Sequence, residues 1–343
     1  MDLTFPLARG SIDPMVDLRS TLKLRDLVAA SPDGYVHELH GPVSVYAVYR
    51  GNVLVETAEE TLKFDEDGCA AHGKNAIPHE RMQLSRISAR YVKECALPLL
   101  AIGRTQDGYF HCALLVDNDT DAYALTKQAS TCAQWIHLRT IGHMLSDDEA
   151  ALSTMAVALA AWHEANPHCV RCGGHTHIAH EGWTRVCPSC EHMEYPRQDP
   201  SVIVAVVDED ERILLAHNMN WREKFMSLPA GFVDAGEAPE RAVIRELNEE
   251  VGLRVDKITY VGSQPWPFPR SLMLGYCAQL HPDSPREPRP DEHEIDRARF
   301  FSREELKKAI EQGELEPPAP TSIARVLIEH WFGGELPTPA ARQ

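Results

Sequence analysis

The segment from Gly231 to Leu253 constrains the fold of this chain more than any other, because it joins a loop to an acidic helix and a helix terminator. It reads GFVDAGEAPERAVIRELNEEVGL. Gly252 fits the position just after the last helical turn, where a left-handed backbone favours glycine. Apolar side chains recur on one face of the helical part, which predicts a helix packed on a sheet. They are Val243, Ile244, Leu247 and Val251.

Three glutamates fall on the adjacent face of this predicted helix. At about 100° per residue, Glu246, Glu249 and Glu250 lie within about 100° of one another. Carboxylates at this spacing repel one another and destabilise an isolated helix. Hard divalent cations such as Mg²⁺ or Mn²⁺ prefer oxygen ligands and would offset that repulsion. The alternative interpretation is a solvated acidic face without a ligand.

The same segment resembles the Nudix signature GX5EX7REUXEEXGU at every fixed position. The resemblance implies that Glu246, Glu249 and Glu250 bind two or three Mg²⁺ or Mn²⁺ ions, and that one of them helps to deprotonate an attacking water. It further implies that Glu237 braces the loop by pairing with Arg245. The signature positions assigned a structural role are Gly231, Glu237, Arg245 and Gly252.

A second motif, Ser263-Gln-Pro-Trp-Pro-Phe-Pro-Arg-Ser271, resembles the SQPWPFPxS segment of the NADH pyrophosphatase family. Its prolines stiffen the backbone and remove hydrogen-bond donors. The segment lies between two strand-like runs, which favours an internal loop over a polyproline ligand for another protein. The side chains that could project from this frame toward a ligand are those of Gln264, Trp266 and Ser271.

The family resemblance extends from about Pro98 to Trp331, and residues 1 to about 97 match only loosely. It implies a substrate-binding set that consists of Phe232, Gln264, Trp266, Ser271, Tyr195 and Ala324. Phe232 is a plausible stacking partner for a nicotinamide or adenine ring. Glu294 matches an additional metal-binding glutamate, with Glu292 as the neighbouring alternative.

Four of the nine cysteines form two Cys-x2-Cys pairs, Cys169 with Cys172 and Cys187 with Cys190. Their spacing is typical of a tetrahedral zinc site, and soft thiolates select Zn²⁺ over Mg²⁺. Four cysteines leave no open coordination position, so we expect one structural zinc per chain. Nearby histidines could substitute as ligands, but ordinary surface histidines are the better interpretation. The odd and uneven cysteine pattern fits a reducing compartment.

The fold class predicted for the chain is α+β followed by α/β. A Nudix α/β/α sandwich at residues 197–343 follows a zinc ribbon at 166–196 and an N-terminal α+β domain at 1–165. The run Ser201–Val207 suits a fully buried strand. Ser146 and Glu149 form a capping-box pattern for a helix that should extend to about Ala165.

A formal charge of −17 argues against broad affinity for nucleic-acid backbones, and we expect no DNA partner. The N-terminus shows no signal-peptide pattern and no apolar run is long enough to span a bilayer. The chain is therefore predicted to be cytoplasmic, without a membrane partner.

The resemblance implies an enzyme that splits the pyrophosphate of NADH or NAD⁺ into nicotinamide mononucleotide and AMP, acts as a homodimer, and could also remove NAD caps from RNA. Two alternatives stay open. One is a broader dinucleotide or nucleoside diphosphate-sugar pyrophosphatase, because the box encodes the reaction rather than the leaving group. The other is a non-catalytic nucleotide- or RNA-binding Nudix module.

Overall fold

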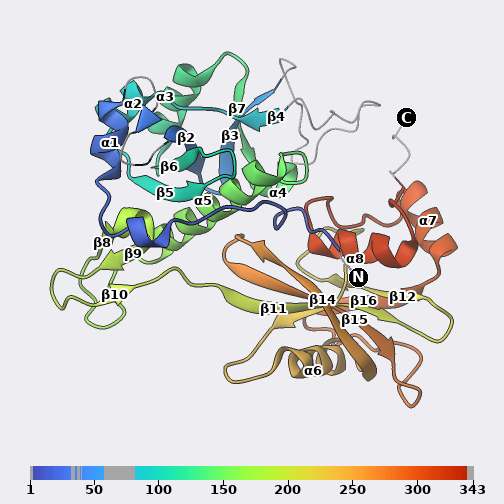
Figure 1. Cartoon of the computed structure of the whole chain (residues 1–343). Coiled ribbons are helices and arrows are strands. Elements are labelled where there is room, and N and C mark those ends of the chain that lie inside the picture. Colours follow the sequence, from blue (N-terminus) through green and yellow to red (C-terminus); the bar gives the residue numbers. More distant parts are fainter. Residues whose placement is uncertain (1–2, 32–34, 37–38, 40, 58–81, 338–343) are drawn as a thin grey trace. The chain divides into compact units, whose positions relative to one another are not determined.

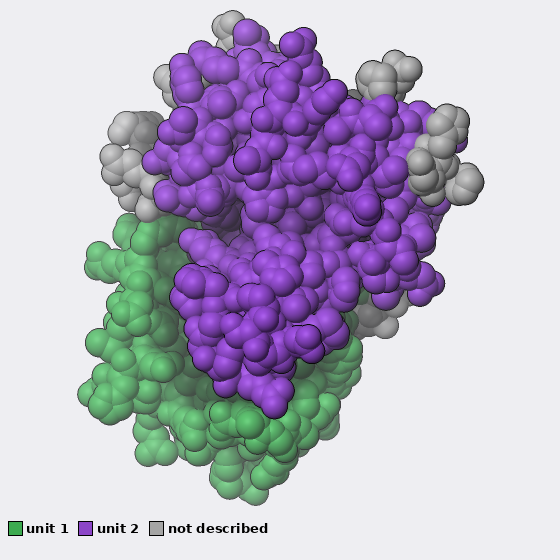
Figure 2. Space-filling view, turned by 90° about the vertical axis from the view of Figure 1, so that its left-hand side faces the viewer, with its two compact units in different colours: residues 1–6, 199–265, 271–343 green, residues 7–198, 266–270 purple. Residues whose placement is uncertain are grey.

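Backbone contacts divide the chain into two compact units, which Figure 2 colours separately. The computed structural model describes residues 3–31, 35–36, 39, 41–57 and 82–337. Unit 1 comprises residues 1–6, 199–265 and 271–343, and unit 2 comprises residues 7–198 and 266–270.

Unit 1 is built on a mixed sheet in the order β14-β15-β11-β12-β16, with β13 beside β11 (Figure 1). Its strands are β11 (Asp199–Val207), β12 (Ile213–Asn218), β13 (Ala230–Phe232), β14 (Val255–Trp266), β15 (Ser271–Leu280) and β16 (Ile295–Phe301). Its helices are α6 (Pro239–Val251), α7 (Arg303–Glu311) and α8 (Ile323–Phe332). Strand β11 pairs in parallel with β15 and antiparallel with β12 and β13.

Strand β11 is buried on both faces, as its β-branched run predicts. Val202, Val204 and Val206 belong to the core that contains the apolar face of α6. Ile203 and Ala205 belong to a second core, which contains side chains of α7 and α8. Because successive side chains of a strand point to opposite faces, the sheet lies between α6 on one side and α7 and α8 on the other. The predicted α/β/α sandwich is confirmed.

Unit 2 contains a second mixed sheet, in the order β4-β3-β2-β6-β5, with β1 beside β2 and β7 beside β3. The strands are β1 (Tyr35–Val36), β2 (Gly41–Tyr49), β3 (Asn52–Thr57), β4 (Met82–Leu84), β5 (Leu99–Arg104), β6 (Phe110–Val116) and β7 (Ala133–His137). The helices are η1 (Val16–Leu18), α1 (Leu24–Ala30), α2 (Ala89–Glu94), α3 (Asp119–Ala129), α4 (Leu138–Ile141) and α5 (Asp147–Ala165). Tyr46 and Val48 face the core that contains α5, whereas Val45 and Ala47 face the core that contains α1, α2 and α3.

Several local predictions agree closely with the structure. Helix α5 begins after Ser146 with a complete capping box to Glu149, and it ends at Ala165. Helix α8 begins at Ile323, directly after its N-cap Ser322. The Pro-rich motif is less loop-like than predicted, since β14 continues to Trp266. An edge strand such as β14 tolerates proline, which removes no ladder bond on its free side.

A small antiparallel sheet in the order β10-β9-β8 follows α5. Its strands are β8 (His177–Ala179), β9 (Thr184–Val186) and β10 (Met193–Glu194), and the 3-10 helix η4 (His180–Gly182) lies between β8 and β9 in the chain. A buried polar contact joins it to α5: His163 Nε2 lies 2.9 Å from the carbonyl oxygen of Gly182, and Arg185 Nη1 lies 3.2 Å from His163 Nδ1. Arg185 donates through Nη1, so Nδ1 accepts and Nε2 carries the proton. Across the residues described, no helix meets the length and apolarity needed to cross a membrane.

The buried His163 predicts an acid-sensitive junction between α5 and the small sheet. Burial, reinforced by Arg185, lowers the pKa of His163 to about 4, against about 6.5 in the unfolded chain. Between these values the unfolded state binds the additional proton, so stability falls as the pH falls from about 6.5 to about 4. The amide of His163→Gln is polar and of similar size, and it does not titrate in this pH range. We expect the stability advantage of the wild type over this variant to shrink between pH 7.5 and pH 5 in urea unfolding. If the stability difference between the two proteins does not change with pH, His163 does not have the lowered pKa, because the other titrating groups are common to both proteins.

Candidate active site

Helix α6 forms as its sequence predicts, between a proline at its start and a glycine at its end. Pro239 occupies the first turn, where its missing N–H costs no intrahelical bond. Gly252 follows the last turn in the left-handed conformation, with φ 66°. The buried face includes Val243, Leu247 and Val251, which turns the glutamates toward the loop that precedes the helix.

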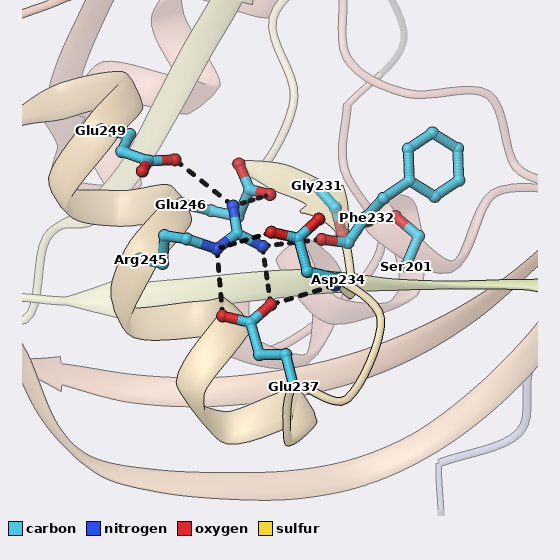
Figure 3. A network of polar contacts seen from close by, with 8 residues as sticks. All are labelled: Ser201, Gly231, Phe232, Asp234, Glu237, Arg245, Glu246 and Glu249. Atoms are coloured by element: carbon cyan, nitrogen blue, oxygen red, sulfur yellow. Dashed lines mark hydrogen bonds and ion pairs between the residues drawn. The ribbon is translucent and has the colours of Figure 1, made fainter.

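Arg245 is the centre of the polar network on this helix (Figure 3). Its Nε and Nη2 donate to the two carboxylate oxygens of Glu237 at 3.0 and 2.8 Å. Its Nη1 donates to Glu246 at 2.7 Å and to Glu249 at 3.3 Å, and Nη2 also donates to the carbonyl oxygen of Phe232 at 2.9 Å. The bidentate pair holds the pKa of Glu237 below its usual range. One guanidinium therefore fixes the loop, the strand β13 and the helix face relative to one another.

Gly231 leaves the space into which the carboxylate of Glu246 fits. A Cβ atom at this position would lie 2.0 Å from Cδ of Glu246, which no real contact permits. The backbone of Gly231 is held in place by pairing with Val202 of β11, and the Ser201 hydroxyl donates to its carbonyl oxygen at 2.9 Å. The glycine of the signature is thus required by a close approach between backbone and carboxylate.

Glu250 is the most unusual carboxylate of the cluster. It is only 6% exposed, and its Oε2 has no hydrogen-bond partner among the described residues. Burial, together with the charges of Glu246 and Glu294, raises the pKa of Glu250 to about 8. Burial also raises the pKa of Glu246, although Arg245 acts in the opposite direction. A buried carboxylate without a partner is costly unless a cation or proton compensates it.

Glu294 directly precedes β16, close enough to raise the pKa values of both Glu246 and Glu250. Its backbone is held by Asp291, whose Oδ1 accepts hydrogen bonds from the N–H groups of Glu294 and Ile295 at 3.1 and 2.9 Å. Glu292 is exposed and has a positive φ of 59°.

The donor set fits hard divalent cations. It consists of carboxylate oxygens, one of which is buried and without a partner, and burial together with their mutual repulsion raises the pKa values of Glu246 and Glu250. Such oxygens are the ligands that Mg²⁺ and Mn²⁺ prefer. Among the described residues, only the four cysteines of the Cys-x2-Cys pairs form a group of three or more whose ligand atoms all lie within 4.8 Å of one another. The carboxylate oxygens of Glu246, Glu249, Glu250 and Glu294 therefore do not form so close a group.

Residues of the predicted substrate set lie in contrasting environments. The side chains of Phe232 and Tyr195 are 56% and 61% exposed, whereas Gln264 is fully buried and its Nε2 donates to the carbonyl oxygen of Thr321 at 3.1 Å. Ala324 is buried in the first turn of α8. Ser271 begins β15. Gln264 therefore contacts the segment that leads into α8. Its amide holds β14 against that segment and is not part of an exposed surface.

The four cysteines Cys169, Cys172, Cys187 and Cys190 come together, with their Sγ atoms within 4.8 Å of one another. A tetrahedral zinc–thiolate site, with Zn–S bonds of about 2.3 Å, requires sulfur separations of about 3.8 Å. The separations of 3.7 Å (Cys169–Cys190) and 3.4 Å (Cys172–Cys187) are close to this value. The group contains no histidine; the rings of His168 and His175 instead contact each other at a tilt of 40°, with centroids 4.3 Å apart. The cluster fits zinc and leaves no position for a further ligand.

Comparison with known proteins shows two domains in the chain. Residues 197–323 match the NUDIX domain, and residues 165–195 match the NADH pyrophosphatase zinc ribbon domain. The chain is 42% identical over 211 residues to the NAD-capped RNA hydrolase NudC of Mycobacterium bovis, covering 59% of this chain and 67% of that protein. The chain belongs to the NADH pyrophosphatase family of Nudix hydrolases.

More distant matches were also found. The human NAD-capped RNA hydrolase NUDT12 is 36% identical over 200 residues, which cover 55% of this chain and 43% of that protein. A NUDIX hydrolase of Nitrosomonas europaea, known from a crystal structure, is 25% identical over 50% of this chain and 96% of its own, with a TM-score of 0.37.

Two side chains of this chain, Asp291 and Ser201, contribute to the site although they were not among the predicted site residues. Asp291 holds the turn that presents Glu294, and Ser201 holds the carbonyl group of Gly231. Asp291 carries a detectable signal, because aspartate commonly accepts from backbone N–H groups two or three residues ahead in turns. The hydrogen bond from Ser201 to Gly231 joins residues 30 positions apart, so no local sequence pattern indicates it.

Substitution of Gly231 should separate catalysis from stability in this family member. In Gly231→Ala the new Cβ must displace the carboxylate of Glu246, which is the flexible end of a side chain. We expect kcat to fall about 100-fold, because a misplacement of about 1 Å has effects of this size, while the melting temperature changes little. Gly334→Ala is the control, because its added Cβ meets nothing within 4 Å. Equal kcat values for the two variants would contradict the role of the close approach.

Proposed function

We propose that the protein is a hydrolase that cleaves the pyrophosphate bond of NADH or NAD⁺ into nicotinamide mononucleotide and AMP. The observation that carries the proposal is the carboxylate cluster of α6, in which Arg245 holds Glu237, Glu246 and Glu249 while Glu250 is buried without a partner. The substrate is inferred from the NADH pyrophosphatase zinc ribbon and from the relatives, whose names refer to NAD.

Glu246, Glu249 and Glu250 would hold two or three Mg²⁺ or Mn²⁺ ions, with Glu294 as a further ligand. When bound, such ions neutralise charge on the pyrophosphate and lower the pKa of a water molecule. We favour Glu294 over Glu292 because the charge of Glu294 acts on both Glu246 and Glu250.

Residues of the chain itself would orient the reaction. Arg245 keeps two carboxylates directed to the loop and leaves Glu250 free of hydrogen bonds at Oε2. One of the three carboxylates on α6 would accept the proton of the attacking water. The exposed ring of Phe232, the residue directly after Gly231, offers a stacking surface for a base. Tyr195, Trp266, Ser271 and Ala324 complete the proposed substrate set, with Gln264 as part of its frame.

RNA with a 5′-terminal NAD presents the same pyrophosphate, and the relatives named above are NAD-capped RNA hydrolases. We therefore propose such RNA as a second substrate. The formal charge of −17 implies that the RNA body adds little nonspecific affinity. A broader dinucleotide pyrophosphatase is the alternative within the same chemistry. A non-catalytic Nudix module is the less favoured reading, because every glutamate of the box is present.

The cysteine cluster is proposed to bind one structural zinc, which would fix the two turns that carry the Cys-x2-Cys pairs. We also retain as proposals the three-domain division at residues 165/166 and 196/197, a homodimer, and a cytoplasmic location.

The proposed reaction predicts the products directly. Purified protein incubated with Mg²⁺ and NAD⁺ should release nicotinamide mononucleotide and AMP in equal amounts, resolved by chromatography. Glu249→Gln should reduce turnover about 100-fold or more and retain the melting temperature, because Glu249 is exposed. Glu304→Gln, which changes an exposed glutamate of α7, is the matched control. Intact NAD⁺, or cleavage at the glycosidic bond, would refute the proposal.

A further inference from the structure

The Pro-rich motif is divided between the two units. Residues 263–265 belong to unit 1, where Gln264 is buried against Thr321. Residues 266–270, here called the tip, belong to unit 2. The tip of a segment that sequence resemblance connects with the nicotinamide substrate therefore belongs to unit 2, whereas the glutamates of α6 belong to unit 1.

Two aromatic side chains of the tip pack together and against unit 2. Trp266 and Phe268 meet edge to face, with ring centroids 5.0 Å apart and planes at 89°. Both rings pack against the core of unit 2, which includes Leu138 and Ile141 of α4. Such an edge-to-face pair is a favoured aromatic geometry.

The polar side of this packing is formed by His137 and Arg139, at the junction of β7 and α4. The imidazole of His137 lies 4.9 Å from the ring of Phe268, and the guanidinium of Arg139 lies 5.8 Å from the centroid of Trp266. The second distance is near the outer limit of a cation–π contact, so Arg139 contributes less than His137.

His137 is itself held in a defined orientation. Its Nδ1 accepts a hydrogen bond from the backbone N–H of Arg139 at 3.2 Å. On its other side the ring lies against Gly51, where an added Cβ would be 2.7 Å from Nε2. Burial, with a smaller contribution from Arg139, lowers the pKa of His137, so the ring facing Phe268 is neutral at pH 7. These contacts therefore hold the imidazole in one orientation against the ring of Phe268.

We infer that His137 and Arg139 are positioning residues that hold the tip of the Pro-rich motif, and through it set the preference for a nicotinamide dinucleotide. The inference rests on the proposed NAD(H) pyrophosphatase function. Its physical basis is preorganisation: a recognition segment that is already ordered loses less conformational entropy when it binds. Prolines 265, 267 and 269 restrict the backbone of the motif, while His137 and Arg139 contact its aromatic side chains.

A role in packing alone predicts a different result. If these residues only stabilise unit 2, their loss lowers the melting temperature and changes turnover of every substrate to the same extent. A positioning role instead acts on substrates that carry the nicotinamide group. ADP-ribose, which has the same pyrophosphate and adenosine but no nicotinamide, separates the two cases.

The test compares kcat and KM for NADH and for ADP-ribose, with Mg²⁺ and the full-length chain. His137→Ala should raise KM for NADH and lower kcat/KM for NADH about tenfold, the size expected for loss of an aromatic contact. Its kcat/KM for ADP-ribose should stay within about twofold. His137→Phe, which preserves a ring beside Phe268, should retain most of the wild-type preference. Arg139→Ala should give a smaller loss of about threefold.

Arg90→Ala is the matched control, because Arg90 is an exposed arginine of unit 2 that pairs with Glu94. Its preference should equal that of the wild type. An unchanged NADH preference in His137→Ala, or an equal loss for both substrates, would overturn the inference. If His137→Ala fails to fold, His137→Phe and Arg139→Ala provide the same comparison. A wild-type protein that leaves NADH intact would instead refute the proposed function.

Discussion

A single guanidinium balances the acidic face on which the rest of the candidate site depends. Arg245 contacts Glu237, Glu246 and Glu249, and it also binds the carbonyl group of Phe232. Three carboxylates therefore share one positive charge, and Glu250 receives no hydrogen bond at Oε2. The network holds the loop and helix together while leaving an excess of negative charge. A divalent cation is the simplest group that would complete it.

The fold supplies the rigidity that this arrangement needs. Strand β11 is buried on both faces, so the strand that pairs with Gly231 is held by two hydrophobic cores. Helix α6 packs its apolar face on one of these cores, which leaves the position of Glu246 relative to Gly231 little freedom. Sites supported by regular elements are held more precisely than sites on loops alone.

Local sequence patterns predicted the helices and the two candidate sites. They did not predict contacts between residues that are far apart in the sequence. The capping box of α5, the end of α6 at Gly252 and the cysteine cluster depend on spacings within a few turns or one motif. The burial of Gln264 depends on a contact with Thr321, 57 positions away, and the effect of Glu294 on Glu250 depends on the path of β16. The division of the Pro-rich motif between the units is likewise invisible to periodicity, because it depends on which core receives each ring.

The central claim is that the carboxylates of α6 bind a divalent cation. It is tested most directly by the Mg²⁺-induced shift in melting temperature at two pH values. Because the pKa of Glu250 is raised to about 8, stability without metal falls as the pH rises from about 4.5 to about 8. Binding should therefore stabilise the wild type more at pH 8.5 than at pH 6. In Glu250→Gln the Mg²⁺-induced shift in melting temperature should be smaller and independent of pH. Equal shifts in both proteins at both pH values would contradict the account.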